Sequence, residues 1–225
     1  MTTSTPPADI MGLRTRDILL YGMTQTVTAA QLMHWAQTTP ELHAFHAPDF
    51  HRLQLEHWIW SHREALGHAI LDVGVYTPRR YMGDGYQTFG ESDDEDVTGD
   101  LLAMPFAADT FDGFVLSEVL EHCVNPIAAV AEVFRVLKPG GLLLVTSPFF
   151  WPDHRTDDYK DYWRFTEQGW ELLLQAFTDV TITPCAWTDE GAAAYDFIRR
   201  FECWGFASQT KATTGYLCTA RKGRA

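Results

Sequence analysis

The chain has 225 residues, of which 46% are hydrophobic, a size and composition that predict one folded domain with a substantial core. Its 17 basic and 30 acidic residues give a formal net charge of −13, which disfavours nucleic acids and anionic membrane surfaces as partners. The first residues lack a signal-peptide pattern, and no apolar run approaches the roughly 20 residues of a membrane span, so a soluble cytoplasmic protein is expected. The four dispersed cysteines include no CxxC pair, which agrees with reduced thiols.

Residues 1–66 are predicted to form an N-terminal tail with helices that belong to the same domain as the rest of the chain. Apolar and aromatic side chains recur at spacings near three and four over 28–37 and 48–66, which is typical of amphipathic helices. The segment is rich in histidine, but His57 and His62 are five residues apart rather than the four that paired helical metal ligands need. Ordinary helix and loop histidines are therefore favoured, and no metal site is expected.

The remainder, 67–225, alternates short apolar runs with amphipathic segments, which predicts a mainly parallel sheet covered on both faces. Helices are expected over 126–137, where Lys-Pro-Gly-Gly at 138–141 supplies a stop, and over 167–177 and 192–206. Strands are expected at seven apolar runs: 69–73, 86–89, 96–98, 111–116, 141–146, 179–184 and 216–221. The fold class is therefore α/β, a Rossmann-like seven-stranded mostly parallel sheet with helices on both faces and an N-terminal helical appendage.

Acidic residues and glycines follow several of the predicted strands. The first strand ends in Asp72-Val-Gly74, and the third is followed by Gly99-Asp100. In an open parallel sheet, ligands bind beyond the carboxyl ends of the strands. A glycine there lets the backbone approach a ligand closely, and a carboxylate accepts hydrogen bonds from it.

The long string from Thr98 to His122, with Gly-Asp, Met-Pro-Phe and Phe-Asp in order, resembles small-molecule methyltransferases of the class I S-adenosylmethionine-dependent family. The resemblance continues through 131–146 and covers residues 69–147. It implies S-adenosylmethionine as cofactor, with Asp72 and Gly74 near its methionine end. It also implies that Asp100 accepts hydrogen bonds from the adenine amino group and that Leu101 lies against the ring.

The sequence departs from this family at two points of the cofactor site. The family has a second glycine two positions after the first, whereas Gly74 is followed by Val75-Tyr76-Thr77-Pro78. Either the loop binds the cofactor with altered geometry or the protein has lost binding, and the intact adenine-side motif favours the first. The acid that should hold the ribose hydroxyls falls in an acidic run over 91–96, where Glu91 is nearest the strand end.

The fourth strand is followed by residues that the resemblance places beside the cofactor. Ser117 and Glu118 should border it, and His122 lies one helical turn beyond Glu118, close enough to face the reaction centre. His122 is a candidate catalytic residue, although a structural cap or pocket wall is the favoured interpretation.

The segment 151–166 combines aromatic, acidic and basic side chains over the same edge of the sheet, which is typical of a lid. It is similar to the His...Asp-Tyr-Trp-Arg-Phe-Thr stretch of methyltransferases from glycan and secondary-metabolite pathways. His154 is the candidate base, and Asp158 is expected to orient or replace it. Four further residues are expected to bind the substrate, although Trp163, with Phe165, could instead anchor the lid: Tyr159, Tyr162, Trp163 and Arg164.

We therefore expect methyl transfer from S-adenosylmethionine to an oxygen, or less readily a nitrogen, of a small polar metabolite. A non-catalytic binding or regulatory module on the same fold is the alternative, and the altered glycine loop is its support. A nucleic-acid or protein methyltransferase would need a basic groove, which the charge balance disfavours.

Overall fold

The computed structural model describes residues 50–74, 83–149, 151, 153–157, 159–185 and 215–224. The predicted helices at 28–37 and 192–206 lie outside these ranges, as does most of the predicted N-terminal appendage. Among the described residues, no helix combines the length and apolar character that crossing a bilayer requires.

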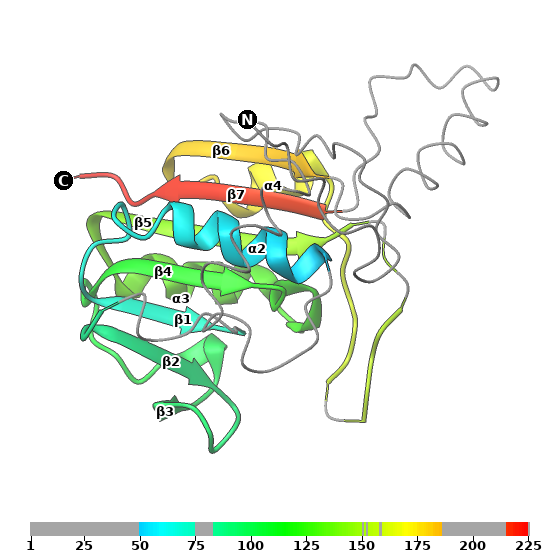
Figure 1. Ribbon diagram of the computed structural model, residues 1–225, viewed down its shortest axis with the longest axis horizontal. Helices are drawn as coiled ribbons and strands as arrows, with labels where there is room; N and C mark the ends of the chain where they lie inside the picture. The colour runs from blue at the N-terminus through cyan, green and yellow to red at the C-terminus, as the bar shows by residue number, and fades with distance from the viewer. Residues whose placement is uncertain are drawn as a thin grey trace, which may run out of the picture.

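The described residues form one sheet of seven strands in the order β3-β2-β1-β4-β5-β7-β6 (Figure 1). The strands are β1 (Ile70–Val73), β2 (Tyr86–Gly90), β3 (Val97–Thr98), β4 (Phe111–Ser117), β5 (Leu137–Pro148), β6 (Thr178–Cys185) and β7 (Gly215–Arg221). β1 to β5 pair in parallel, whereas β7 is antiparallel to both β5 and β6. The predicted sheet is thereby confirmed, with the carboxyl ends of β1, β2, β4 and β5 at a common edge.

Helices cover both faces of the sheet. α2 (Phe50–Ser61) lies on one face, and α3 (Pro126–Val136) and α4 (Glu167–Leu173) lie on the other (Figure 1). Leu55 and Ile59 of α2 form one buried cluster with Val115 and Leu144 of the sheet. A larger cluster joins the opposite sheet face to α3 and α4, so the core consists of two layers separated by the sheet.

α3 begins where its sequence provides a cap. The Asn125 side chain accepts a hydrogen bond from the Ala128 amide, and Pro126 occupies the first helical position, where its missing N–H has no cost. Ala129, Val130 and Val133 recur at helical spacing and are buried against the sheet.

Three helix ends differ from the prediction. α2 ends at Ser61, where the hydroxyl donates to the Trp58 carbonyl, and α4 ends at Leu173. α3 ends at Val136, and β5 begins at Leu137 rather than at 141, because Leu137 already pairs with Phe111 of β4. The predicted Lys-Pro-Gly-Gly stop is therefore an early, irregular part of a strand, with Gly140 at φ +83°.

Candidate active site

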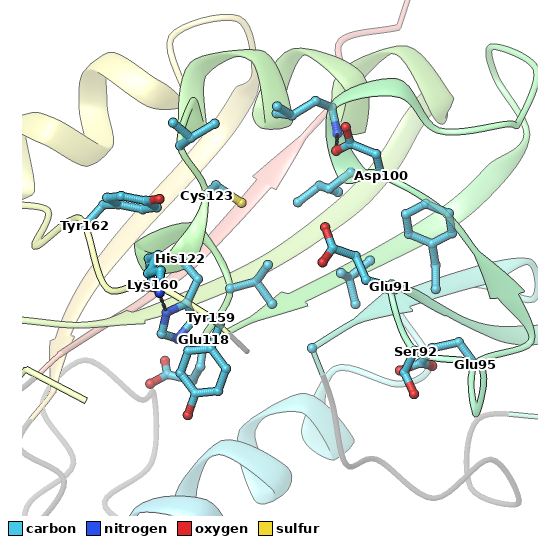
Figure 2. Close-up of a pocket in the computed structure, with 18 of the residues that line it drawn as sticks. Glu91, Ser92, Glu95, Asp100, Glu118, His122, Cys123, Tyr159, Lys160 and Tyr162 are labelled. Carbon is cyan, nitrogen blue, oxygen red and sulfur yellow. Dashed lines mark hydrogen bonds between the residues drawn. The ribbon is translucent and has the colours of Figure 1, made fainter. Parts of the chain in front are cut away.

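A cleft of about 840 Å³ opens at the carboxyl edge of the sheet, within the usual range for a small-molecule site. Figure 2 shows Glu91 and Asp100 towards one end of it and His122, Tyr159 and Tyr162 towards the other. Its walls come from the segments that follow β1, β2, β3, β4 and β5 and from the lid: 73–74, 89–92, 95, 99–102, 118–119, 122–124, 148, 151, 154, 159–160 and 162.

Gly74 lines the cleft directly after β1. Its φ is +83°, and a Cβ added there would lie 2.0 Å from Val119 Cγ2 and 2.7 Å from the Ser117 carbonyl oxygen. Only glycine fits this position, since a side chain would meet both β-strand backbone and a neighbouring residue. The following positions 75–78, where the family's second glycine is missing, lie outside the described residues.

The adenine end of the predicted cofactor site has two carboxylates. Glu91, at the end of β2, and Asp100, after β3, both line the cleft, as does Leu101. Asp100 Oδ1 accepts from the Leu102 amide at 2.8 Å and thereby caps the short helix η3 (Leu101–Ala103). This bond fixes the carboxylate in place, and a carboxylate has capacity for further hydrogen bonds from a ligand.

Asp72 and Ser117, which the sequence places at the cofactor, do not line the cleft. Asp72 is buried and accepts a hydrogen bond from the Tyr86 hydroxyl, and burial raises its pKa well above the usual range. It shares the α2 face of β1 with Ile70, whereas Leu71 and Val73 face α3. Ser117 is also buried, with its Oγ 3.0 Å from Thr146 Oγ1. Their cofactor contacts stay predictions.

Glu118 lines the cleft in a conformation that non-glycine residues seldom adopt. Its φ is +57°, at a cost of about 1–3 kcal/mol. Thr146 Oγ1 donates to Glu118 Oε1 at 2.8 Å, and the Glu118 amide donates to the Thr146 carbonyl at 3.2 Å. β5 therefore holds the residue that follows β4, and strain of this kind is common at functional sites.

At the other end of the cleft, His154 is held by an acid that the sequence analysis missed. His154 Nδ1 lies 3.0 Å from Asp161 Oδ2, and the same oxygen accepts from the His154 amide at 3.0 Å. Arg164 donates to both Asp161 oxygens at 2.5 and 2.7 Å. This guanidinium holds the pKa of the nearly buried Asp161 far below its usual range. The predicted partner Asp158 lies outside the described residues.

His122 contacts the same group of rings. Its Nδ1 lies 2.5 Å from the Lys160 carbonyl oxygen, a bond in which the imidazole N–H must be the donor. The ring centroids lie 4.9 Å from His154 and 4.6 Å from Tyr159. Burial lowers the pKa of His122, so its imidazole is neutral at physiological pH.

Some aromatic residues of the lid line the cleft, and others anchor the lid to the rest of the protein. Tyr159 and Tyr162 line the cleft, together with Trp151 and Lys160, which the sequence analysis did not single out. Trp163 does not line it, and its Nε1 donates to the Cys123 carbonyl at 2.7 Å. Arg164 does not line the cleft either, and its guanidinium donates to Asp161. The two alternatives for the lid, pocket wall and anchor, thus apply to different residues.

Cys123 also lines the cleft. Burial raises the pKa of its thiol to about 12, so the thiolate needed for covalent chemistry is scarce. Alignment and proton transfer, not attack by a protein nucleophile, are what the described side chains offer.

The Rossmann-like sheet with its antiparallel final strand, and the cleft bordered by carboxylates after β2 and β3, agree with the fold that the sequence resemblance implies. Residues 85–145 match the family model described as "Methyltransferase domain". Over residues 85–145 the chain is therefore similar to methyltransferases, as the sequence resemblance to the class I S-adenosylmethionine-dependent family implies, and S-adenosylmethionine is the cofactor of that family.

Named relatives agree over short segments. The chain is 49% identical over 49 residues to the ubiquinone/menaquinone biosynthesis C-methyltransferase UbiE of Roseobacter denitrificans, which covers 22% of this chain and 20% of that protein. It is 34% identical over 90 residues to 24-methylenesterol C-methyltransferase 3 of Arabidopsis thaliana, which covers 39% and 25%. The matches span only a fifth to a quarter of these relatives.

Solved structures share the fold at low identity. Phosphoethanolamine N-methyltransferase 2 of Haemonchus contortus, solved with S-adenosyl-L-methionine, has a TM-score of 0.54 at 13% identity and covers 88% of this chain and 58% of that one. The cyclase SpnF has a TM-score of 0.51 at 17% identity and covers 88% and 98%. Both comparisons support the fold class.

Proposed function

We propose that the protein transfers the methyl group of S-adenosylmethionine to a hydroxyl oxygen of a small polar acceptor. The observation that carries this proposal is the His154–Asp161 pair, held by Arg164 at the end of the cleft opposite Glu91 and Asp100. A cofactor between the two ends would direct its methyl group away from the carboxylates and towards the lid.

The cofactor end of the cleft supplies recognition. Asp100 is proposed to accept from the adenine amino group while Leu101 covers the ring, and Glu91 to accept from the ribose hydroxyls. Gly74 leaves room for the backbone of the first loop to approach the methionine end. All four line the described cleft.

The acceptor end supplies alignment and a base. S-adenosylmethionine supplies an electrophilic methyl group, and attack by the acceptor oxygen forms the methyl–oxygen bond as the methyl–sulfur bond breaks, leaving S-adenosylhomocysteine. His154 takes the acceptor's proton on Nε2, because Nδ1–H is held by Asp161. Asp161 then stabilises the imidazolium with its negative charge, a role that requires its own pKa to stay low.

The acceptor class follows from the lining of the lid end. Tyr159, Tyr162 and Trp151 give flat apolar surfaces with polar edges, which suit a ring-bearing or sugar-like metabolite. A place in a glycan or secondary-metabolite pathway, and action in the cytoplasm without nucleic acid or membrane partners, belong to the same proposal. The named relatives are C-methyltransferases, but each match covers at most 39% of this chain, so the choice of oxygen as the acceptor atom rests on His154 and Asp161.

Calorimetric titration with S-adenosylmethionine and S-adenosylhomocysteine tests the cofactor half of the proposal. Both ligands should bind the wild type, and Asp100→Ala should weaken binding by about tenfold or more, because it removes an acceptor from the adenine site. Asp94→Ala, an exposed acid outside the cleft lining, is the matched control and should bind normally.

A screen of hydroxylated acceptors with mass measurement tests the transfer half. A product heavier by one methylene group, absent without S-adenosylmethionine, is the expected result. Cofactor binding without any methylated product would favour the non-catalytic alternative, and the cyclase SpnF shows that this fold serves other chemistry. No binding of either cofactor form would overturn the proposal.

A further inference from the structure

Three potential metal ligands meet beside the cleft: Glu121, His122 and His154. One ligand atom of each lies within 4.8 Å of the others, and His122 Nε2 is 3.7 Å from Glu121 Oε1. In an occupied tetrahedral site with metal–nitrogen bonds of about 2.0–2.1 Å, ligand atoms are about 3.4 Å apart. Small side-chain rotations would therefore close the group around an ion.

Glu121 is a buried carboxyl whose hydrogen-bonding capacity is not satisfied. Its side chain is fully buried, and within the part of the chain that the structure describes neither carboxylate oxygen has a hydrogen bond of good geometry; the nearby Ser147 side chain and the residue's own backbone lower its pKa without making such a bond. A buried carboxyl without partners costs several kcal/mol if charged, so native structures pair such a group or bind a metal with it. Burial and the nearby Glu118 raise its pKa, and Arg164 and Ser147 only partly oppose this.

Both imidazoles are oriented as metal-binding histidines are. A ligating histidine donates its other ring N–H to a carboxylate or a backbone carbonyl, which fixes the ring and raises ligand basicity. His154 Nδ1 is held by Asp161, and His122 Nδ1 by the Lys160 carbonyl. These bonds favour the tautomers in which each Nε2 carries a lone pair.

The charges around the group favour a cation. Glu118 and Asp161 are the acidic groups beside the three ligands, and the nearby Arg164 guanidinium is already bound to Asp161. Figure 2 shows His122 beside Tyr159 and Glu118 at the cleft wall, so an ion bound there would be reachable from the cleft. Two imidazoles and one carboxylate suit zinc, cobalt, nickel or iron better than magnesium or calcium, which prefer oxygen ligands.

We propose that Glu121, His122 and His154 form a binding site for a divalent transition-metal ion, with Asp161 and the Lys160 carbonyl as supporting acceptors. The site does not rest on methyl transfer, and its occupation and the base step exclude each other, because Nε2 of His154 cannot bind a metal and accept a proton at once. From the sequence alone no metal site is expected. This group of ligands has no recognisable spacing, since 31 residues separate His122 from His154 of the lid.

Titration of untagged, chelator-treated full-length protein with Co²⁺ tests the site without cofactor or acceptor. We expect one equivalent to bind with the visible absorption of a protein-ligated Co²⁺ ion, and Zn²⁺ to displace it. Glu121→Gln, which keeps the size of the side chain, should abolish the absorption or weaken binding at least about tenfold, and Asp161→Asn should weaken it about 10–100-fold.

Two controls separate this site from other Co²⁺ binding. Glu118→Gln removes a neighbouring acid that is not one of the three ligands and should have a smaller effect than Glu121→Gln. The double variant His43→Gln/His46→Gln removes N-terminal histidines outside the described residues and should bind as the wild type does. Equal binding by wild type and Glu121→Gln, or Mg²⁺ binding as tightly as Co²⁺, would overturn the proposal. A loss of binding in His43→Gln/His46→Gln alone would overturn it too.

Discussion

His154 depends on Asp161 for both its orientation and its charge balance. Asp161→Asn keeps the shape of the side chain but removes the negative charge that would stabilise the imidazolium. We expect kcat for methyl transfer to fall by about 100-fold with the affinity for S-adenosylmethionine unchanged, because Asp161 acts through the base and not on the cofactor. Turnover assays combined with cofactor titration check this split.

The matched control is Asp153→Asn. Asp153 is an exposed lid acid that pairs with the exposed Arg155 at 2.8 Å, and its loss should leave kcat near the wild-type value. Thermal unfolding of Asp161→Asn must be followed as well, since Arg164 loses its carboxylate partner. A similar loss of kcat in both variants would show that the lid, not the base, is disturbed.

Asp161 shows where residue-level prediction ends. The sequence indicates that His154 needs an acid, and the lid offers four within seven residues, at positions 153, 157, 158 and 161. Which one reaches the ring depends on the turn of the lid between them, and no periodicity predicts that turn. The spacing of Asp161 and Arg164, three residues apart, was the available signal of an ion pair.

The role of Gly74 can be tested by comparison with Gly83, which also has a positive φ but has no atom within 4 Å of an added Cβ. Gly74→Ala should weaken S-adenosylmethionine binding by about tenfold or more and lower stability, because its Cβ would lie 2.0 Å from Val119 and 2.7 Å from the Ser117 carbonyl. Gly83→Ala shares the strain of a positive φ, +85°, but has no atom within 4 Å of the added Cβ. Calorimetry on both variants separates backbone strain from steric overlap of the added Cβ. Equal cofactor affinity in the two variants would contradict the steric argument.

At the scale of elements, α3 determines where the loop that follows Asp100 lies. Arg135 donates to the carbonyls of Met104 at 3.1 Å and Phe106 at 2.7 Å, and Glu132 accepts from the Met104 amide at 3.1 Å. Both side chains are partly exposed, so their ion pair itself contributes little. Their bonds to the backbone hold the loop that follows Asp100.

Arg135→Leu should therefore loosen the loop that follows Asp100 while the fold persists. We expect the free energy of unfolding to fall by about 1–2 kcal/mol, since two carbonyls lose their donor, and the Kd for S-adenosylmethionine to rise. Urea denaturation and calorimetry measure the two effects. Arg155→Leu, which removes an exposed pair with Asp153, should change neither, and an unchanged Kd in Arg135→Leu would show that the loop position is fixed without α3.

The limits of a strand were predictable where the local pattern of apolar residues determines them. They were less predictable where pairing with another strand determines them. β1, β2 and β4 are short apolar runs bounded by polar turns, and their predicted limits differ from the observed ones by one residue at most. β5 extends further because the segment before its apolar run pairs with β4, and Lys138 bonds to Asp112 at 2.7 Å. The burial of Asp72 was likewise not predictable from local pattern, because it depends on which face of the sheet α2 covers.

At the scale of the whole molecule, two buried carboxyls make the stability depend on pH. Burial raises the pKa of both Asp72 and Glu121 well above their unfolded values. Between the pKa of each carboxyl in the unfolded state and its higher pKa in the folded state, the folded protein binds more protons than the unfolded chain. The free energy of unfolding therefore falls as the pH rises through that range. Asp161 and Asp112, whose pKa values are lowered, act oppositely at acidic pH. His122 and His57, whose pKa values burial lowers, also act oppositely, as the pH rises through the usual range of imidazole.

Asp72→Asn should flatten this dependence, because the amide can still accept from the Tyr86 hydroxyl but cannot ionise. Urea denaturation at about pH 6 and about pH 8.5, in the presence of a chelator so that Glu121 binds no metal, measures the change. The wild type should lose stability across this range by up to about 1.4 kcal/mol per pH unit for each carboxyl, and Asp72→Asn should lose less. Asp94→Asn, an exposed acid, removes the same formal charge from a net of −13 and should follow the wild type. If both variants flatten the dependence equally, general charge repulsion rather than burial of Asp72 is responsible.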